Sequence, residues 1–143
     1  MVYICYLRKR VVYLPVLAKE KRGGHRTIDP VAVAPVSDED ALRRAFHETI
    51  AQGNPVVTTA LQPNYPEFVV LKHAGVKDYT TFTRGTLTWI IEKKSGEYRI
   101  IGQRRLRGAW VDDPDQTIAL PQGAGVDDLI ERMIGILQAA TKQ

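Results

Sequence analysis

The residues with the most distinctive chemistry are Trp110 and the carboxylates that follow it, Asp112, Asp113 and Asp115. Clustered carboxylates are ligands for Ca²⁺, but this stretch lacks the glycine and the distal glutamate of a twelve-residue calcium loop, and Pro114 interrupts it. A solvated turn or a partner contact explains the aspartates better. Tryptophan is most often a core residue, yet an aromatic side chain beside charges has the composition of an interface hot spot. These four residues are therefore our candidate partner-binding set.

The three histidines do not form a recognisable catalytic or metal site. None of His25, His47 and His73 has a second histidine or a cysteine at ligand spacing. His73 could act as a general acid only with a partner such as Lys72 or Asp78, and spacing alone cannot establish that pairing. No serine or threonine has a nucleophile context, and no phosphate loop is present. We predict no enzyme, no catalytic residues, no metal and no cofactor.

Two short basic clusters stand out in the sequence. Arg104, Arg105 and Arg107 follow Arg99 in one predicted strand and its exit, and a second cluster is Arg8-Lys9-Arg10. Exposed Lys and Arg residues at strand tips commonly protect sheet edges from aggregation. They can also bind phosphates while aromatic side chains stack on bases. A nucleic-acid-binding module using Arg99, Arg104, Arg105 and Arg107 is thus the alternative function.

The net charge of +4 is arranged in blocks. Residues 1–30 carry seven Lys/Arg against two Asp/Glu, residues 91–108 carry six against two, and residues 109–143 carry two against six. These blocks predict one basic and one acidic region on the surface, and they do not indicate a uniformly cationic nucleic-acid binder.

The single cysteine and the absence of long apolar runs bear on the cellular compartment of the protein. Cys5 cannot form an internal disulfide, which fits a reducing cytosol, and its apolar segment Val2–Leu7 predicts a buried thiol. No apolar run approaches the roughly 20 residues that span a bilayer. The first residues lack the basic region and cleavage site of a signal peptide. We expect a cytoplasmic protein without membrane contact.

Alternating and β-branched segments predict an antiparallel sheet. The clearest strand is Thr86–Lys93, which a Lys-Lys-Ser-Gly turn joins to a strand at Glu97–Leu106. The other predicted strands are Val2–Leu7, Val11–Leu17, Thr27–Val36, Val56–Leu61, Phe68–Leu71, Trp110–Val111 and Thr117–Leu120. Because proline cannot donate to a ladder, Pro15 predicts that its strand lies at an edge or ends there. Residues 112–115 predict a polar break between the last two segments.

Two amphipathic helices complete the predicted fold. Ser37–Gly53 begins at the N-cap candidate Ser37, with acidic residues in its first turn and an apolar stripe at helical spacing. Val126–Thr141 carries a second stripe, and Val76–Phe82 could form one or two helical turns. We predict a single α+β domain over residues 1–143, with a mainly antiparallel sheet of about six strands and two main helices packed on one face. The other face would be solvated or used for contact.

Three segments, Val31–Val57, Val69–Glu92 and Trp110–Leu137, resemble small bacterial immunity proteins of contact-dependent growth inhibition systems (CdiI-type). Together they cover somewhat more than half of the chain. The resemblance is one of general pattern, and it carries no invariant functional residue over to this sequence. It implies a compact cytosolic protein that binds the toxic C-terminal domain of a partner effector. Inhibitors of nucleases often present an acidic face, whereas this chain is net basic.

Three hypotheses follow for the function. The first is a stoichiometric protein inhibitor that binds and neutralises such a toxin domain, with Trp110 as anchor and the aspartates as mimics of substrate charge. The second is the nucleic-acid-binding module. The third is a small enzyme using His73 with a carboxylate. We expect a protein partner, no membrane and no small-molecule substrate.

Overall fold

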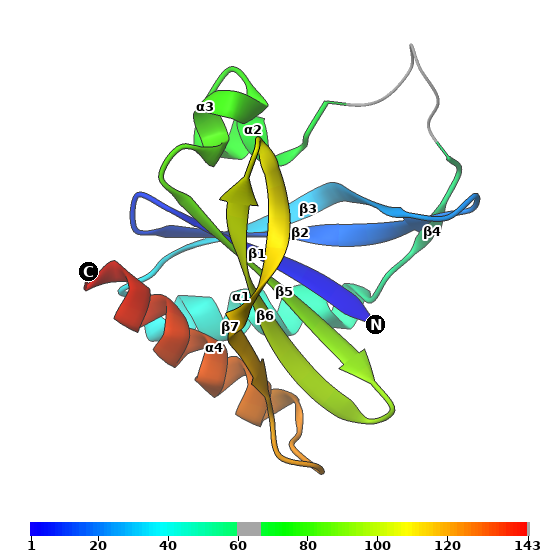
Figure 1. The fold of residues 1–143 in the computed structure, drawn as a ribbon, viewed down its shortest axis with the longest axis vertical. Coiled ribbons are helices and arrows are strands. Elements are labelled where there is room, and N and C mark those ends of the chain that lie inside the picture. Colours follow the sequence, from blue (N-terminus) through cyan, green and yellow to red (C-terminus); the bar gives the residue numbers. More distant parts are fainter. Residues whose placement is uncertain (60–66, 143) are drawn as a thin grey trace.

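The computed structural model describes residues 1–59 and 67–142 (Figure 1). Its sheet has the strand order β3-β2-β1-β5-β6-β7, and the short β4 pairs with the end of β2. The strands are β1 (Val2–Arg8), β2 (Val11–Glu20), β3 (His25–Pro35), β4 (Val56–Val57), β5 (Thr86–Lys94), β6 (Glu97–Leu106) and β7 (Ala109–Ala119). The helices are α1 (Glu39–Gln52), α2 (Val70–Ala74), α3 (Tyr79–Thr83) and α4 (Val126–Thr141). All pairs are antiparallel except β2–β4, so the predicted single-domain α+β fold is confirmed.

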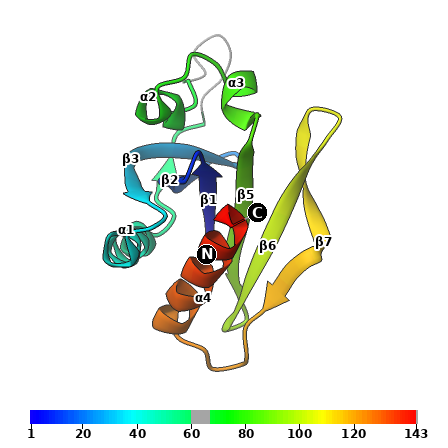
Figure 2. The same ribbon diagram turned by 90° about the vertical axis from the view of Figure 1, so that its left-hand side faces the viewer.

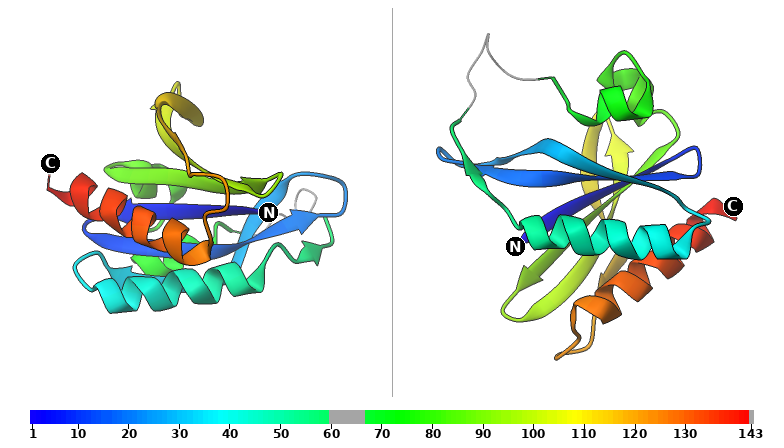
Figure 3. Two further views of the ribbon diagram at one scale, coloured as in Figure 1. Left: turned by 90° about the horizontal axis from the view of Figure 1, so that it is seen from below. Right: turned by 180° about the vertical axis from the view of Figure 1, so that it is seen from behind.

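The main hydrophobic core lies between one face of the sheet and the two long helices. Helices α1 and α4 lie side by side beneath the strands (Figure 3). Their apolar stripes, which include Phe46 and Met133, meet alternate strand residues such as Cys5, Trp89 and Ile100. Because side chains alternate across a strand, the same strands point their intervening residues to the other face. The predicted packing of two main helices on one face is confirmed.

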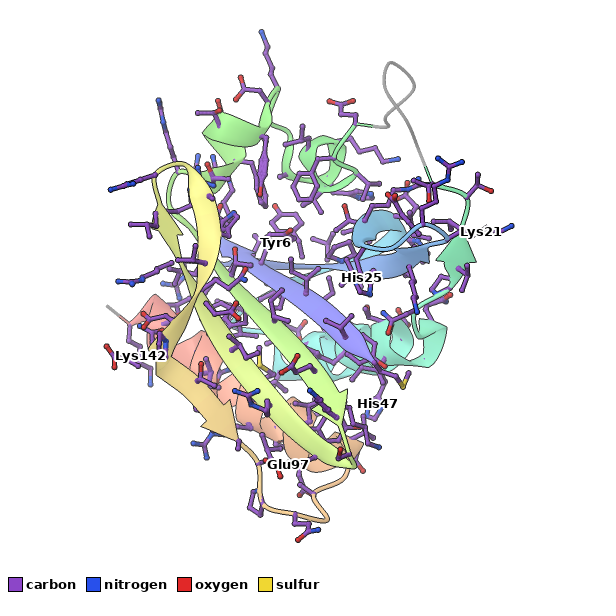
Figure 4. The ribbon with its side chains drawn as sticks, turned by 45° about the vertical axis from the view of Figure 1, so that its right-hand side comes forward. Tyr6, Lys21, His25, His47, Glu97 and Lys142 are labelled. Atoms are coloured by element: carbon purple, nitrogen blue, oxygen red, sulfur yellow. The ribbon has the colours of Figure 1, made fainter. Side chains whose placement is uncertain are left out.

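The other face of the sheet carries a second, smaller core. Tyr6 and Tyr13 on this outer face pack against Phe68, Leu71 and Phe82 from the segment that contains α2 and α3. Figure 4 shows Tyr6 pointing from β1 toward these two short helices. The rings of Tyr6 and Phe82 meet edge to face, with centroids 5.3 Å apart. The expectation of a solvated or contact face is therefore wrong where α2 and α3 cover it.

Three hairpins, β1–β2, β5–β6 and β6–β7, close with two-residue turns, as the strand registers show, whereas the β2–β3 connection is longer. The central residues are Lys9-Arg10, Ser95-Gly96 and Arg107-Gly108, and all six have positive φ angles. Positive φ at both central residues is the mark of a type I′ turn, whose twist matches that of the flanking strands. This turn normally favours Asn-Gly, so Lys9 and Arg10 are unusual occupants.

Two of the predicted strands differ in the structure. Phe68–Leu71 was predicted as a strand, but Val70–Ala74 forms helix α2, because Val70 and Leu71 are both buried in the second core and Gly75 ends the helix with a φ of 70°. The predicted strand Val56–Leu61 is reduced to Val56–Val57, and its last two residues lie outside the described residues.

Two expectations about prolines and caps are also wrong. Pro15 lies inside β2, which continues to Glu20 and is not an edge strand; the proline is accommodated because the pairing with β1 ends at Tyr13 and the register with β3 shifts between Pro15 and Val16. The N-cap of α1 is Asp38, not Ser37, since the Asp38 carboxylate accepts a hydrogen bond from the backbone N–H of Ala41 at 3.0 Å.

Candidate interaction surface

The far half of the β6–β7 hairpin extends beyond the rest of the sheet. The pairing of β5 with β6 ends at Thr88 and Gln103, so residues 104–111 pair only across the hairpin itself. Figure 2 shows this two-stranded ribbon leaning away from α1 and α4. Such a projecting ribbon can contact a partner without disturbing either core.

Trp110 sits on this ribbon opposite Arg105. The Arg105 guanidinium lies 5.2 Å from the indole centroid, a cation–π contact that covers one face of the ring. The side chain of Trp110 is half-buried, and its indole Nε1 is buried with no hydrogen-bond partner among the described residues. Trp110 is thus not part of either hydrophobic core.

The three candidate aspartates lie at an irregularity in β7, with Asp112 at its edge and Asp113 and Asp115 within it. Asp112 accepts a hydrogen bond from the Gln103 side chain at 3.0 Å. The Asp113 carboxylate accepts one from the backbone N–H of Asp115 at 3.1 Å, and its carbonyl accepts one from the Thr117 hydroxyl at 3.0 Å. Asp112 and Asp115 are exposed, whereas Asp113 is half-buried. Within the described ranges, no group of three or more His, Cys, Asp or Glu residues could hold a metal ion.

The irregularity is a large bulge, and it corrects the predicted break between Trp110–Val111 and Thr117–Leu120. β7 continues through residues 112–115, because Ile101 pairs with Thr117 while Gln103 pairs with Asp112. One residue of β6, Gly102, therefore faces four residues of β7. A Cβ atom on Gly102 would lie 2.7 Å from the Cβ of Gln116, so only glycine permits this approach. In the sequence, Pro114 is the one residue that indicates an interruption at the position of this bulge.

A hollow of about 450 Å³ lies beside the bulge on the outer face, between Glu92, Arg99, Ile101, Asp112, Pro114 and Thr117. Arg99 donates a hydrogen bond to the Glu92 carboxylate here at 3.1 Å. Arg99 pairs with Ala119, whereas Arg104 and Arg105 lie beyond the bulge on the projecting ribbon. The structure therefore separates Arg99 from the other three arginines.

The structure instead joins those three arginines to other cations. Arg8 pairs with Thr86 at the start of β5, and Thr88 pairs with Gln103 near the end of β6. The tips of β1 and β6 and the loop before β5 thus meet at one end of the sheet. We call this surface the basic end; its exposed cations are Lys9, Arg10, Arg84, Arg104, Arg105 and Arg107. In the sequence those three arginines and Arg8-Lys9-Arg10 form two separate clusters, because only the strand register places them at the same end of the sheet.

His73 has a carboxylate partner, but not the predicted one. Its Nε2 lies 3.1 Å from Asp29 of β3, and Lys72 donates to the same carboxylate at 2.7 Å. These hydrogen bonds lower the pKa of Asp29 from its ordinary value. Asp78 instead caps α3 by accepting from the backbone N–H of Thr81. Asp29, Lys72 and His73 are exposed, and their contacts hold α2 against β3, so these residues stabilise the fold.

The remaining cysteine and histidine candidates lie in surroundings that give them structural roles. Cys5 is fully buried in the main core, as predicted, and burial raises the pKa of its thiol. His47 lies 3.3 Å from Asp127 and links α1 to α4 on the surface. His25 begins β3 and is exposed. Figure 4 shows it near the β2–β3 turn.

Comparison with known proteins extends the description of the fold. No protein-family model and no curated protein matches the sequence. The chain is similar to the solved structure of a protein of unknown function from Neisseria meningitidis, with a TM-score of 0.64 and 10% sequence identity, over 97% of this chain and 93% of that one. This likeness shows a shared fold. Among the described helices, none is long and apolar enough to cross a membrane.

Proposed function

We propose that this protein is a stoichiometric inhibitor of the immunity-protein type, which binds and neutralises the toxic C-terminal domain of a contact-dependent growth inhibition effector in the cytoplasm. The observation that carries the proposal is Trp110, a tryptophan on the projecting ribbon, outside both cores, covered by Arg105 and followed by two exposed aspartates at the bulge.

The composition of the ribbon supports a protein contact. Tryptophan and arginine are the residues most enriched in the energetic centres of protein interfaces. Leu106 is 50% exposed and Leu87, on the neighbouring strand, is 44% exposed. Exposed apolar side chains on the ribbon and on the adjacent strand supply surface that gains free energy when a partner excludes water.

The aspartates supply a second element of recognition. Asp112 and Asp115 are exposed, and the bulge orders the backbone between them through the hydrogen bonds of Asp113. An ordered backbone loses less conformational entropy on binding than a mobile one. Two carboxylates presented from this backbone beside an aromatic anchor could occupy a cationic substrate site, which is how a protein can imitate an anionic substrate.

Co-expression tests the proposal. The chain is produced together with the C-terminal domain of the effector encoded beside its gene, and we expect protected cells and a co-purifying 1:1 complex. Trp110→Ala should weaken this complex by at least about 2 kcal/mol, or roughly 30-fold in Kd. Asp112→Asn with Asp115→Asn should also weaken it. The matched control is Glu48→Gln with Glu67→Gln, which changes two exposed carboxylates elsewhere. Failure to protect the cells would refute the proposal.

A nucleic-acid-binding module is the second candidate, because Arg104, Arg105 and Arg107 lie together on the basic end. Binding to phosphates through these residues would weaken steeply as salt rises. Two observations disfavour this function: Arg99 is engaged by Glu92, and the aspartates stand on the same hairpin. Absence of binding to any DNA or RNA at low salt would exclude it.

A further inference from the structure

We infer that the basic end is a docking surface for a carboxylate-rich face of the protein partner. The inference rests on the proposed function and names the chemistry of the toxin domain's surface that this end would meet. It also assigns the contact to two segments beyond the Trp110 ribbon, the β1–β2 turn and the loop before β5.

The cations of the basic end are not paired by salt bridges; of the described acids, Asp78 lies near enough to Arg84 for that cation to contribute, after the hydrogen bonds from Thr81, to its lowered pKa. None of its six exposed cations, and not Arg8, makes an ion pair with a carboxylate in the described part of the chain. Elsewhere on the surface, Arg43, Lys72 and Arg99 each pair with an acid. The basic end therefore retains a net positive potential, which attracts an acidic surface over roughly a Debye length.

Buried Arg8 fixes the centre of this surface. Its side chain is 8% exposed, and its Nη1 donates to the carbonyls of Phe82 at 3.3 Å and Arg84 at 2.5 Å. The guanidinium also lies 6.0 Å from the Phe82 ring. Arg8 thus adds a charge beneath the surface and holds the backbone of the loop that presents Arg84.

Three of the exposed cations occupy conformations that disfavour them. Lys9, Arg10 and Arg107 have φ angles of 50°, 66° and 51°, where glycine or asparagine is preferred. Long cationic side chains at such positions cost conformational free energy without contributing to either core. Outliers of this kind cluster at functional sites, so the three residues point to selection for charge at the tips.

The surroundings of the basic end favour a protein over a nucleic acid. Five of its six exposed cations are arginines, whose planar guanidinium binds carboxylates in a bidentate manner. Leu106 stands between Arg105 and Arg107 and is half exposed, and Leu87 lies on the adjacent strand. Apolar side chains interleaved with arginines match a protein interface, whereas a phosphate backbone offers them no contact.

Association kinetics with the toxin domain test the inference. The first variant, Lys9→Glu with Arg84→Glu and Arg107→Glu, reverses one charge in each segment of the basic end. The control, Lys21→Glu with Arg22→Glu and Lys94→Glu, makes the same charge change at exposed cations elsewhere. Figure 4 shows Lys21 at the β2–β3 turn, across the molecule from the β6–β7 hairpin. Circular dichroism and unfolding curves confirm that both variants fold.

We expect the first variant to lower the association rate at least tenfold in low salt and to flatten its salt dependence, while the control changes the rate less than threefold. Equal effects of the two variants would overturn the inference while the proposed function stands. No binding by the wild-type protein would overturn the proposed function and this inference with it. Tighter binding of a 20-nucleotide single-stranded RNA than of the toxin domain, lost in the first variant, would assign the surface to nucleic acid and overturn the inference.

Discussion

Gly102 and Gln116 face each other across the β6–β7 pair so closely that any side chain at position 102 would collide with the Gln116 backbone and Cβ. A Cβ on Gly102 would lie 2.7 Å from the Gln116 Cβ and 3.2 Å from its carbonyl oxygen. This contact allows four residues of β7 to loop past one residue of β6, and so places Asp112 at the edge of the bulge and Asp115 within it. The glycine therefore positions the candidate interaction surface.

Gly102→Ala should destabilise the protein by about 1–3 kcal/mol, because the added methyl group must displace backbone or a Cβ atom. Chemical denaturation measures this loss. Gly135→Ala in α4 is the matched control: nothing described lies within 4 Å of its Cβ position, and alanine is favoured over glycine in helices, so that variant should gain up to about 1 kcal/mol. A Gly102→Ala variant as stable as the wild type would show that β7 can shift without loss of stability.

The parts of the fold that sequence could predict are those with a strong local period. The stripes of α1 and α4 and the alternation that buries Trp89 and Ile91 each reflect packing on one face, and the structure confirms them, whereas Leu87 at the start of the same strand is exposed. The prediction of a strand at Phe68–Leu71 was wrong because a short apolar run does not distinguish a buried strand from a buried helix. The α2–α3 segment obtains its stability from Tyr6 and Tyr13, which are distant in sequence.

The candidate site was predictable only in its composition. Trp110 and the aspartates stood out as residue types, but their arrangement depends on the Gly102 bulge, which no periodicity reveals. The basic end depends on strand register, since Arg84 joins Lys9 and Arg107 only when β5 lies between β1 and β6. Likewise, nothing in the spacing of His73 indicates Asp29 as its partner, because that contact joins residues 44 positions apart.

Arg8→Met tests whether a buried cation fixes the loop before β5. The change preserves apolar volume but leaves the Arg84 carbonyl without its donor, whereas the Phe82 carbonyl retains the Thr86 hydroxyl. We expect a loss of about 1–3 kcal/mol in the free energy of unfolding, together with faster amide hydrogen exchange in residues 84–86. Arg44→Met, at an exposed position of α1, should change stability by less than about 0.5 kcal/mol. Unchanged exchange would mean that the loop does not depend on Arg8.

The ion pair between α1 and α4 predicts a dependence of stability on pH. Arg43 donates to Glu131 through Nε at 2.7 Å and through Nη2 at 2.9 Å, and these hydrogen bonds lower the pKa of Glu131 below its ordinary value of 4.5. A lowered folded-state pKa stabilises the protein above the unfolded-state pKa, and this contribution disappears as pH falls through the folded-state value.

Glu131→Gln should therefore be less stable than the wild type at pH 7, by a small amount because both side chains are exposed and salt screens them. The difference should shrink below about pH 4.5 and also in high salt. Urea denaturation over a pH series measures it, with Glu67→Gln as the exposed control. A difference that stays constant down to pH 2 would contradict the assigned ion pair.

The β1–β2 turn predicts that stability and binding can be separated. Lys9→Asn with Arg10→Gly replaces two side chains held at φ angles of 50° and 66° with the residues that a type I′ turn prefers. The free energy of unfolding should rise by about 1 kcal/mol, because the turn no longer holds a bulky residue in a left-handed conformation. Ser95→Asn, in a turn that already contains Gly96, should gain less.

The same double variant should associate more slowly with the toxin domain, because it removes two charges from the basic end. Thermal denaturation and stopped-flow association, measured on one preparation, compare the two effects directly. A variant that is both more stable and equally fast would show that Lys9 and Arg10 are tolerated without use in binding. A variant that is more stable but slower would show that charge at this turn is retained at the expense of stability, as the unusual φ angles indicate.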